Sequence, residues 1–249
     1  MTVNGRWPRQ PSHVYTFDNP SLTLPEVERA RALVRAKRLC KPIRLVFVGR
    51  AASAKGLGVA LQVVQRLVEG SDGALGLDVT FDVLGDGPER ASFEQECHQM
   101  GLDAVVCFHG WVPHVRVCAM LRDAHLILLP SQTEGWPKVL SEAMAFGVVP
   151  VSSRVSAIPQ VLAEIGSGVA LAPDDVWGYV RAIRRIVHEP GVWEEMVEAG
   201  LRAAPRFTYE RYLMQLDEML TEVYGESHFD RGFMAELAAR WSTVDGGEA

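Results

Sequence analysis

Residues 126–147 read LILLPSQTEGWPKVLSEAMAFG. The opening run, 126–129, is short, apolar and strand-like, and it ends at Pro130 and Ser131. A helical pattern begins a few residues later, so Glu134 lies on a loop after a strand and Glu142 lies in the first turns of the next helix. Open α/β sheets bind their ligands in the crevice at the carboxyl ends of the strands. This stretch therefore predicts a β–α unit with a ligand site at its turn.

The residue types at this turn indicate what the ligand carries. The first turn of a helix offers free N–H groups and a positive dipole to an anion. The two carboxylates, Glu134 and Glu142, can accept hydrogen bonds from hydroxyl groups. A ligand with both phosphates and hydroxyls fits this combination, and a sugar nucleotide is such a ligand.

The same alternation of strand and helix runs along most of the chain. Strands are predicted at 43–48, 78–84, 104–108, 125–130, 148–152 and 168–171. Helices are predicted near 57–68, 88–100, 114–122, 138–146, 157–164, 175–188, 191–202 and 208–224. Alternation with short connections implies a parallel sheet with helices on both faces. We therefore expect a single Rossmann-like α/β domain with about six parallel strands.

The predicted domain covers residues 43–225. Residues 1–42 precede it and contain an extended arm, over 1–24, followed by a charged helix at 25–40. Residues 226–249 are predicted to form a C-terminal tail with one short helix at 233–241.

The composition narrows the possible functions. The 249 residues carry a net charge of −6, which gives no electrostatic case for binding nucleic acid or an anionic membrane. The chain shows neither an apolar run long enough to cross a bilayer nor an N-terminal signal core, so a cytoplasmic protein is expected. Its four cysteines form no C-x-x-C pair and its seven histidines are dispersed, so we expect no metal.

Three further loops follow predicted strands. The loop 49–56 carries two cations, Arg50 and Lys55, that could neutralise a diphosphate, although it could equally be a solvated loop. It is neither a Walker loop nor a G-x-G-x-x-G fingerprint. The loop that begins at Gly85 is most simply a turn with Pro88 as the first helical residue. The backbone after His109 could meet a nucleobase, unless the neighbouring tryptophan, Trp111, is a packing anchor.

The carboxyl ends of parallel strands share one edge of a sheet. We therefore expect Arg50, Lys55, Gly85 and the segment 134–142 to converge on one cleft. This joint placement favours a functional interpretation more strongly than any of the loops does alone.

These residues resemble the nucleotide-sugar-binding C-terminal domain of retaining GT-B glycosyltransferases of family four, from about Ile43 to Tyr224. The matching segments are Gly49-Arg50 with Lys55-Gly56, Gly85-Asp86-Gly87-Pro88, Phe108-His109-Gly110-Trp111-Val112, Pro130-Ser131 with Glu134-Gly135-Trp136-Pro137, Glu142-Ala143-Met144-Ala145-Phe146-Gly147 with Pro150-Val151, and Phe207-Thr208-Tyr209-Glu210. The block 130–147 is long and specific, and it argues against a sugar-nucleotide epimerase of similar architecture.

The resemblance implies roles for individual residues. Arg50 and Lys55 would hold the donor diphosphate, Glu134 would bind the transferred sugar, and Glu142 would bind the ribose. Lys138 could add a further phosphate contact or face solvent. The nucleotide-binding set implied by the resemblance is Gly49, Gly85, His109, Gly135, Trp136, Pro137, Lys138, Val139 and Glu142, with backbone N–H groups of 136–139 meeting the phosphate or sugar.

The sequence also departs from the family pattern. His125 stands where the family often has Asp, and residues 156–160 replace its usual GG-x-P-E. Only about 42 residues precede the first matched strand, whereas the family carries a complete acceptor-binding domain there. We therefore expect the donor-binding half of a retaining glycosyltransferase, completed by another domain, another chain or a second copy. The alternative is a noncatalytic nucleotide-sugar-binding or regulatory subunit. Three aromatic residues of the arm are candidates to cover the exposed surface: Trp7, Tyr15 and Phe17.

Overall fold

The computed structural model describes residues 2–3, 5–6, 9–70, 75–225, 227 and 229–245. Its strands are β1 (Thr2–Val3), β2 (Tyr15–Thr16), β3 (Ile43–Val48), β4 (Val79–Leu84), β5 (Val106–Gly110), β6 (Leu126–Leu129), β7 (Val149–Ser153) and β8 (Val169–Leu171). Its α-helices are α1 (Leu24–Val34), α2 (Leu57–Glu69), α3 (Arg90–Gln99), α4 (His114–Asp123), α5 (Lys138–Ala145), α6 (Ile158–Ile165), α7 (Val176–His188), α8 (Val192–Ala203), α9 (Tyr209–Tyr224) and α10 (Arg231–Asp245). Two 3₁₀ turns are η1 (Ser53–Lys55) and η2 (Ala204–Phe207).

Six of these strands form one parallel sheet in the order β5-β4-β3-β6-β7-β8. The chain adds strands outward from β3 through β4 to β5, and then returns to the other side of β3 with β6. The strand order therefore reverses between β3 and β6, and such a reversal is where doubly wound sheets bind nucleotides. The predicted Rossmann-like domain with about six parallel strands is confirmed.

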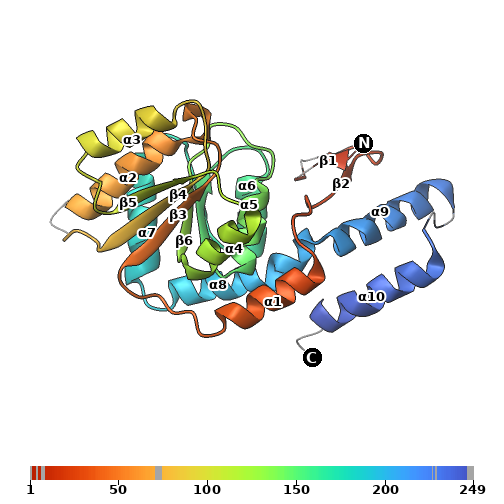
Figure 1. Ribbon diagram of the computed structural model, residues 1–249. Helices are drawn as coiled ribbons and strands as arrows, with labels where there is room; N and C mark the ends of the chain where they lie inside the picture. Colours follow the sequence, from red (N-terminus) through yellow and green to blue (C-terminus); the bar gives the residue numbers. More distant parts are fainter. Residues whose placement is uncertain are drawn as a thin grey trace.

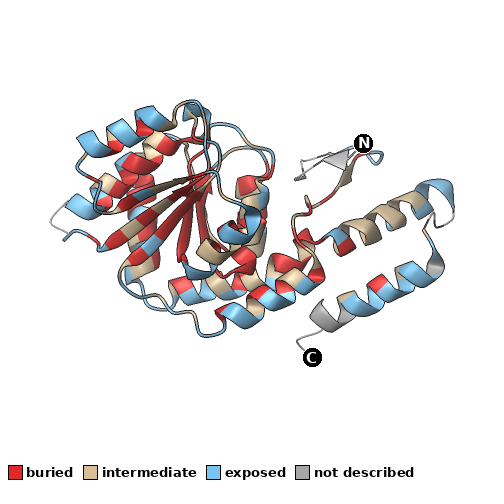
Figure 2. Cartoon of the chain, in the orientation of Figure 1, coloured by how far each residue is buried: buried red, intermediate tan, exposed pale blue. Residues whose placement is uncertain are grey.

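Helices cover both faces of this sheet (Figure 1). The first face is covered by α2, α3 and α7, and the second by α4 and α5. The central strands are mostly buried, although Arg44 of β3 is exposed, and all four residues of β6 are buried (Figure 2). A continuous apolar run is what a parallel strand buried on both faces requires, which explains why 126–129 is Leu-Ile-Leu-Leu.

The helices at the two ends of the chain differ in length from those that the sequence predicts. The first helix ends at Val34, earlier than predicted, and Lys37 then turns inward, where its Nζ donates to the carbonyls of Leu121 and Phe146 at 3.2 and 2.8 Å. At the other end of the chain, α10 is longer than the predicted 233–241 and packs against α9.

The arm lies against the C-terminal helical region. Its Ser21 N–H donates to the carbonyl of Phe207 at 2.9 Å, and the ring of Phe17 packs against that of Tyr212 with centroids 5.5 Å apart. Of the aromatic residues predicted to cover an exposed surface, Phe17 is buried, Tyr15 is half-buried and Trp7 lies outside the described residues.

Two loops meet at the reversal point with almost no space between them. Gly56, at the end of the loop after β3, has φ +74°, and a Cβ there would lie 2.0 Å from the carbonyl oxygen of Pro130 after β6. The backbone N–H of Gln132 donates to the carbonyl of Ala54 at 2.9 Å. Only glycine satisfies both the left-handed backbone and the close approach.

His125, just before β6, is almost completely buried and neutral. Its Nδ1 accepts the backbone N–H of Arg44 at 3.0 Å, and its ring meets Trp193 edge-on with centroids 6.0 Å apart. Burial lowers the pKa of His125 to about 4, and the charges of Lys37 and Arg44 act in the same direction. The protonated ring could not accept the N–H of Arg44, so this core contact depends on the neutral form.

We predict that Gly56→Ala is far more destabilising than Gly101→Ala. Gly101 also has positive φ, +70°, but no atom lies within 4 Å of a Cβ built there. Gly101→Ala should therefore cost only the left-handed strain, about 1–2 kcal/mol. Gly56→Ala adds overpacking against Pro130, for a total of about 2–5 kcal/mol. Urea unfolding measures both variants, and equal losses would show that the two loops can separate without cost.

We also predict that acid destabilises the wild type through His125. The folded pKa of about 4 lies below that of an unfolded histidine, so the unfolded chain binds the extra proton and stability is lost as pH falls from about 6.5 through 4. His125→Asn keeps an oxygen that can accept the N–H of Arg44 but does not titrate in this window. Urea unfolding across this range should show the wild type losing roughly 3 kcal/mol more than the variant. Parallel curves for the two proteins would contradict this assignment.

Candidate functional site

The centre of the candidate site is an ion pair at the reversal point of the sheet. Lys55 Nζ lies 2.6 Å from Glu134 Oε1, and the two side chains are 33% and 11% exposed. Lys55 comes from the loop after β3 and Glu134 from the loop after β6, so the pair spans the gap between the two strands where the order reverses. The structure therefore brings together two of the residues that the sequence predicted to converge.

The first turn of α5 lies next in the chain. Its N-cap, Pro137, has an extended backbone and makes no side-chain capping bond, so the helix presents the N–H groups of Lys138 and Val139 without a side-chain acceptor. The helix dipole adds positive potential at the same place. This is a suitable geometry for an anion beside the Lys55–Glu134 pair.

Trp136 fixes the loop that leads into this turn. Its side chain is buried, its ring stacks on Phe207 with centroids 5.2 Å apart, and its Nε1 donates to Ser141 Oγ at 2.7 Å. The indole therefore packs behind the loop and leaves only backbone for a ligand. The sequence did not predict this contact, in which the Ser141 hydroxyl is the acceptor that holds Trp136.

Glu142, in the second turn of α5, is 13% exposed and faces the start of α4. Its Oε2 lies 3.5 Å from Nε2 of His114, the first residue of α4. Burial raises the pKa of Glu142, and His114 and Lys138 partly offset that effect. The predicted helix near 114–122 is confirmed, since α4 begins at His114 directly after the proline at its N-cap. The contact of His114 with Glu142 was not predicted.

Arg50 lies in a groove at the carboxyl ends of β3, β4 and β5. Gly49, Arg50, Gly85 and Trp111 line this groove, whose volume is about 310 Å³. Trp111 is 76% exposed, so it is not the packing anchor that a lone tryptophan usually is. Its indole instead stands at the mouth of the groove as an apolar surface.

Glu89 holds the loop that carries Arg50. Its carboxylate accepts the backbone N–H of Ser53 at 2.9 Å and also the Ser53 hydroxyl, and these bonds lower the pKa of Glu89. The residue is the N-cap of α3, which begins at Arg90, so the prediction of Pro88 as the first helical residue was wrong by two positions. The cause is that Glu89 turns toward loop 49–56 instead of joining the helix.

Two predicted site residues direct their side chains away from the ion pair. Lys138 Nζ lies over the ring of Tyr209, 5.9 Å from its centroid. His109 is still within β5, and its Nε2 lies 2.6 Å from Asp82 Oδ1. For both residues, only the backbone remains available to the predicted ligand.

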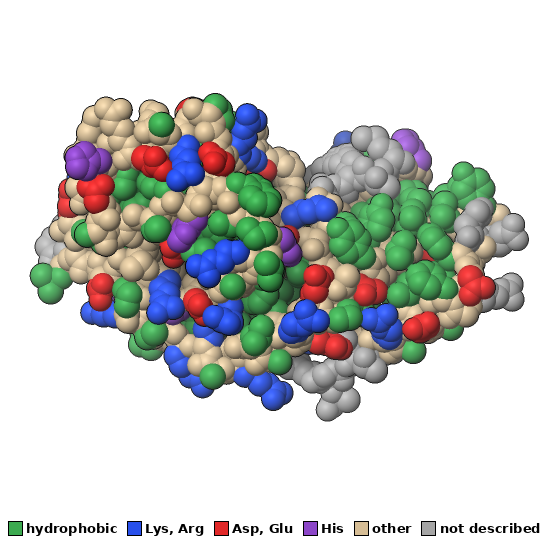
Figure 3. Space-filling model, viewed as in Figure 1, with side chains coloured by type: hydrophobic (Ala, Val, Ile, Leu, Met, Phe, Trp, Pro, Cys, Tyr) green, Lys and Arg blue, Asp and Glu red, His purple; other side chains and the backbone are tan. Residues whose placement is uncertain are grey.

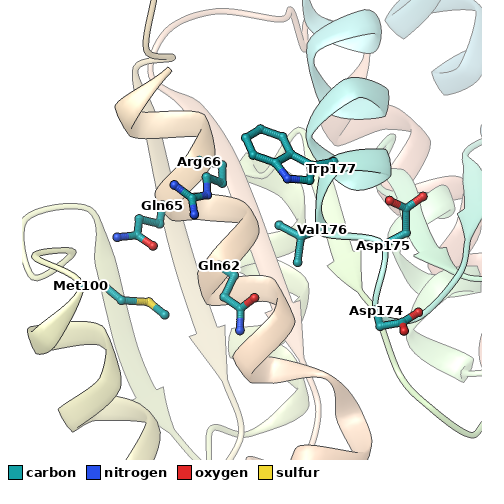
Figure 4. A pocket seen from close by; sticks show the side chains of 8 residues that line it. All are labelled: Gln62, Gln65, Arg66, Met100, Asp174, Asp175, Val176 and Trp177. Carbon is teal, nitrogen blue, oxygen red and sulfur yellow. The ribbon is translucent and has the colours of Figure 1, made fainter. Parts of the chain in front are cut away.

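A separate hollow of about 540 Å³ lies between α2 and the start of α7 (Figure 4). Arg66 lies over the ring of Trp177, 5.5 Å from its centroid, and the side chain of Asp175 caps α7 by accepting the N–H of Gly178 at 2.8 Å. The residues that line this hollow include none of the predicted site residues. Arg66 and Asp175 are engaged in packing and capping, and the hollow lies away from the carboxyl ends of β3 and β6, so we do not assign it as the candidate site.

None of the described helices is both long enough and apolar enough to cross a bilayer.

Comparison with known proteins places this architecture in a family. The chain is 30% identical over 175 residues to the 2-deoxystreptamine glucosyltransferase of Streptomyces kanamyceticus, a match that covers 70% of this chain and 44% of that protein. Among solved structures, the sucrose-phosphate synthase of Thermosynechococcus elongatus superposes with a TM-score of 0.70 at 20% identity, over 90% of this chain and 58% of that one. Anabaena Alr3699/HepE, solved in complex with UDP, superposes with a TM-score of 0.69 at 15% identity, over 84% of this chain and 57% of that one.

These matches define both the family and the extent of the likeness. The chain spans less than half of the length of the S. kanamyceticus relative, and the matched region is a C-terminal-like GT-B domain. The family model described as "Glycosyl transferases group 1" matches residues 33–203, which include the whole six-stranded sheet and the candidate site. The chain therefore belongs to the group 1 glycosyl transferases.

Proposed function

We propose that this chain is the donor-binding half of a retaining glycosyltransferase that uses a nucleotide sugar. The observation that carries this proposal is the Lys55–Glu134 pair, which lies where the strand order reverses and beside the uncapped start of α5. A cation, a carboxylate and a helix N-terminus at this position suit a ligand with phosphates and hydroxyls. A UDP complex among proteins of the same fold supports a nucleoside diphosphate as the shared part of the donor.

In this proposal, the donor diphosphate competes with Glu134 for Lys55. A diphosphate would accept from Lys55 Nζ and from the N–H groups at the start of α5, with Arg50 as a second cation. Glu134 would then be free to accept hydrogen bonds from the transferred sugar. The negative charge that develops on the leaving diphosphate would meet fixed positive groups, so side chains and the helix dipole would stabilise that charge without a metal.

Glu142 is proposed to accept the hydroxyls of the ribose. It lies about one turn along α5 from the proposed phosphate position and is only slightly exposed, so a hydrogen bond there would be made in a largely desolvated place. Glu134 and Glu142 act as binders in this scheme, and neither is assigned as the nucleophile of a glycosidase-like pair. The backbone beside His109 and Trp111 would lie against the nucleobase.

We further propose that the acceptor is held by another domain or chain. The match covers 44% of the S. kanamyceticus enzyme, which supports the proposal that this region is the donor-binding part of a longer protein. Apolar side chains also gather over α9 on one face of the molecule (Figure 3). On this helix Tyr209 and Val223 are 46% and 54% exposed. A surface of this kind is typical of one that packs against a partner. A noncatalytic nucleotide-sugar-binding subunit would use the same site without the acceptor half.

We predict that Glu142→Gln weakens UDP binding by about 1–3 kcal/mol, the range for hydrogen bonds to a charged group. The variant keeps the size of the side chain and removes its charge. Glu198→Gln on α8 is the matched control, because Glu198 is 73% exposed and lies outside the proposed site. Calorimetry with UDP measures both variants, and an unchanged affinity in folded Glu142→Gln would show that Glu142 is structural.

The raised pKa of Glu142 gives this prediction a pH signature. Its carboxylate takes up a proton at a higher pH than an ordinary glutamate does, so UDP affinity should begin to fall earlier on acidification. Glu142→Gln should lack that early fall, and Glu198→Gln should retain it. Identical pH profiles in the wild type and Glu142→Gln would contradict the role in ribose binding.

We also predict that the purified chain binds UDP but transfers little sugar on its own. A site that binds the donor equally strongly in the ground state and in the transition state does not accelerate transfer. Transfer also needs an acceptor that is held in the right orientation. Initial rates are measured with a panel of sugar nucleotides and acceptors, across protein concentrations and with an added candidate acceptor-binding domain. Transfer only with that domain supports a catalytic half, and binding without transfer in every mixture supports the noncatalytic alternative. Robust transfer by the monomer alone would overturn the need for a partner.

A further inference from the structure

Three metal-binding side chains gather on one face of the sheet, away from the proposed donor site. Asp82 on β4 and both Cys107 and His109 on β5 place one donor atom each within 4.8 Å of the others. They belong to the edge strand and its neighbour, whereas the Lys55–Glu134 pair comes from the loops after β3 and β6. The cluster is therefore a separate feature of the fold.

The backbone itself produces this cluster. Residues i and i+2 of a strand share one face, so Cys107 and His109 point to the same side of β5. Asp82 is paired in register with Cys107 on the neighbouring strand, which puts its carboxylate on that same face. The arrangement depends on strand pairing inside the sheet and not on the conformation of a loop.

This part of the sheet is not closed off by a helix. A hollow of about 500 Å³ lies between it and α4, and Asp82 and Cys107 are among the residues that line it. Cys107 is exposed, and Asp82 and His109 are half-buried. An ion can therefore reach the three donors from solvent.

We infer that Asp82, Cys107 and His109 form a zinc site with one position open to water. Thiolate, imidazole and carboxylate are the donors that Zn²⁺ takes, and three protein ligands with a fourth open position is a common arrangement. Zinc–ligand distances of about 2.0–2.3 Å place tetrahedral donors roughly 3–4 Å apart, so the present spacing needs only side-chain rotation. The ion would replace the contact of 2.6 Å between His109 and Asp82.

Charge balance supports zinc at this place. One thiolate and one carboxylate neutralise Zn²⁺ completely, so the occupied site carries no net charge. The same hollow is lined by charges of both signs, with Arg44, Arg116 and Arg122 against Asp103 and Asp123, so a neutral occupied site adds no unbalanced charge to it. Binding releases the thiol proton to solvent, so affinity should increase as pH rises.

The test is titration of the metal-stripped chain with Zn²⁺ by calorimetry and with Co²⁺ by absorption spectroscopy. We expect one ion per chain and a thiolate-to-cobalt charge-transfer band. Cys107→Ser should remove the band and weaken Zn²⁺ binding about 100-fold or more, because even the outer partners of a metal ligand are worth about 10- to 100-fold. Asp82→Asn and His109→Gln should each weaken Zn²⁺ binding while keeping a thiolate band.

Cys118→Ser is the matched control. Cys118 lies 3.8 Å from the ring nitrogens of His114 and is the thiol most able to imitate such a site elsewhere. Its removal should leave both the Co²⁺ band and the Zn²⁺ affinity unchanged. A band that survives Cys107→Ser, or one that disappears in Cys118→Ser, would overturn the assignment, as would a stoichiometry of zero. Because Cys107 is exposed, its replacement by serine should leave the thermal unfolding of the metal-stripped chain unchanged, which separates loss of metal from loss of fold.

Discussion

The close approach of two loops at the reversal point is the constraint on which the rest of the site depends. Gly56 lies against the carbonyl of Pro130, and the backbone bond from Gln132 to Ala54 fixes the distance between the loops. Neither contact involves a side chain that could bind a ligand. Together they bring Lys55 within 2.6 Å of Glu134, which neither strand could do by itself. Backbone packing therefore positions the two loops, and the ion pair forms between side chains that this packing has already brought together.

Because backbone contacts hold the two loops together, the ion pair between Lys55 and Glu134 is able to exchange partners. A partly exposed pair contributes little net stability, because the attraction of its charges is offset by lost hydration and side-chain entropy. Since the loops are already held by Gly56 and by backbone bonds, the fold does not depend on the Lys55–Glu134 contact. In the proposed function, a diphosphate would then take Lys55 at small cost, and the released carboxylate would stay in position for sugar hydroxyls. Preorganised charges of this kind are what stabilise a developing anion.

The sequence predicted the sheet well because its signals are local and strong. Apolar runs such as 126–129 can be interpreted without knowing their neighbours, and the six strands, the β/α alternation and the placement of residues 50, 55, 134 and 142 on loops or helix starts followed from them. What it could not predict was side-chain pairing between distant segments. His114 beside Glu142 depends on how α4 and α5 pack, and Lys138 over Tyr209 depends on where α9 lies. The hydrogen bond from Trp136 to Ser141 joins residues only five positions apart. The sequence still could not predict it, because it did not show that the indole of Trp136 is buried and needs an acceptor.

The C-terminal helical region packs directly against the loop that carries Glu134 and Trp136. Phe207, in η2 just before α9, stacks on Trp136 of this loop, and its carbonyl also accepts the N–H of Ser21 from the arm. Glu210 in the first turn of α9 accepts the N–H at the start of α1 at 3.1 Å, so the arm, α1 and α9 are tied at the same point. The exposed apolar side chains of α9 lie at both ends of that helix, with Tyr209 at its start and Val223 near its end. A domain that docks on α9 would therefore press on an element that is rigidly attached to the loop carrying Glu134. In the proposed function, docking of an acceptor-binding domain on α9 would be transmitted to the loop that carries Glu134 through the contact between Phe207 and Trp136. This contact is the physical reason to expect the two halves of such an enzyme to work as one site.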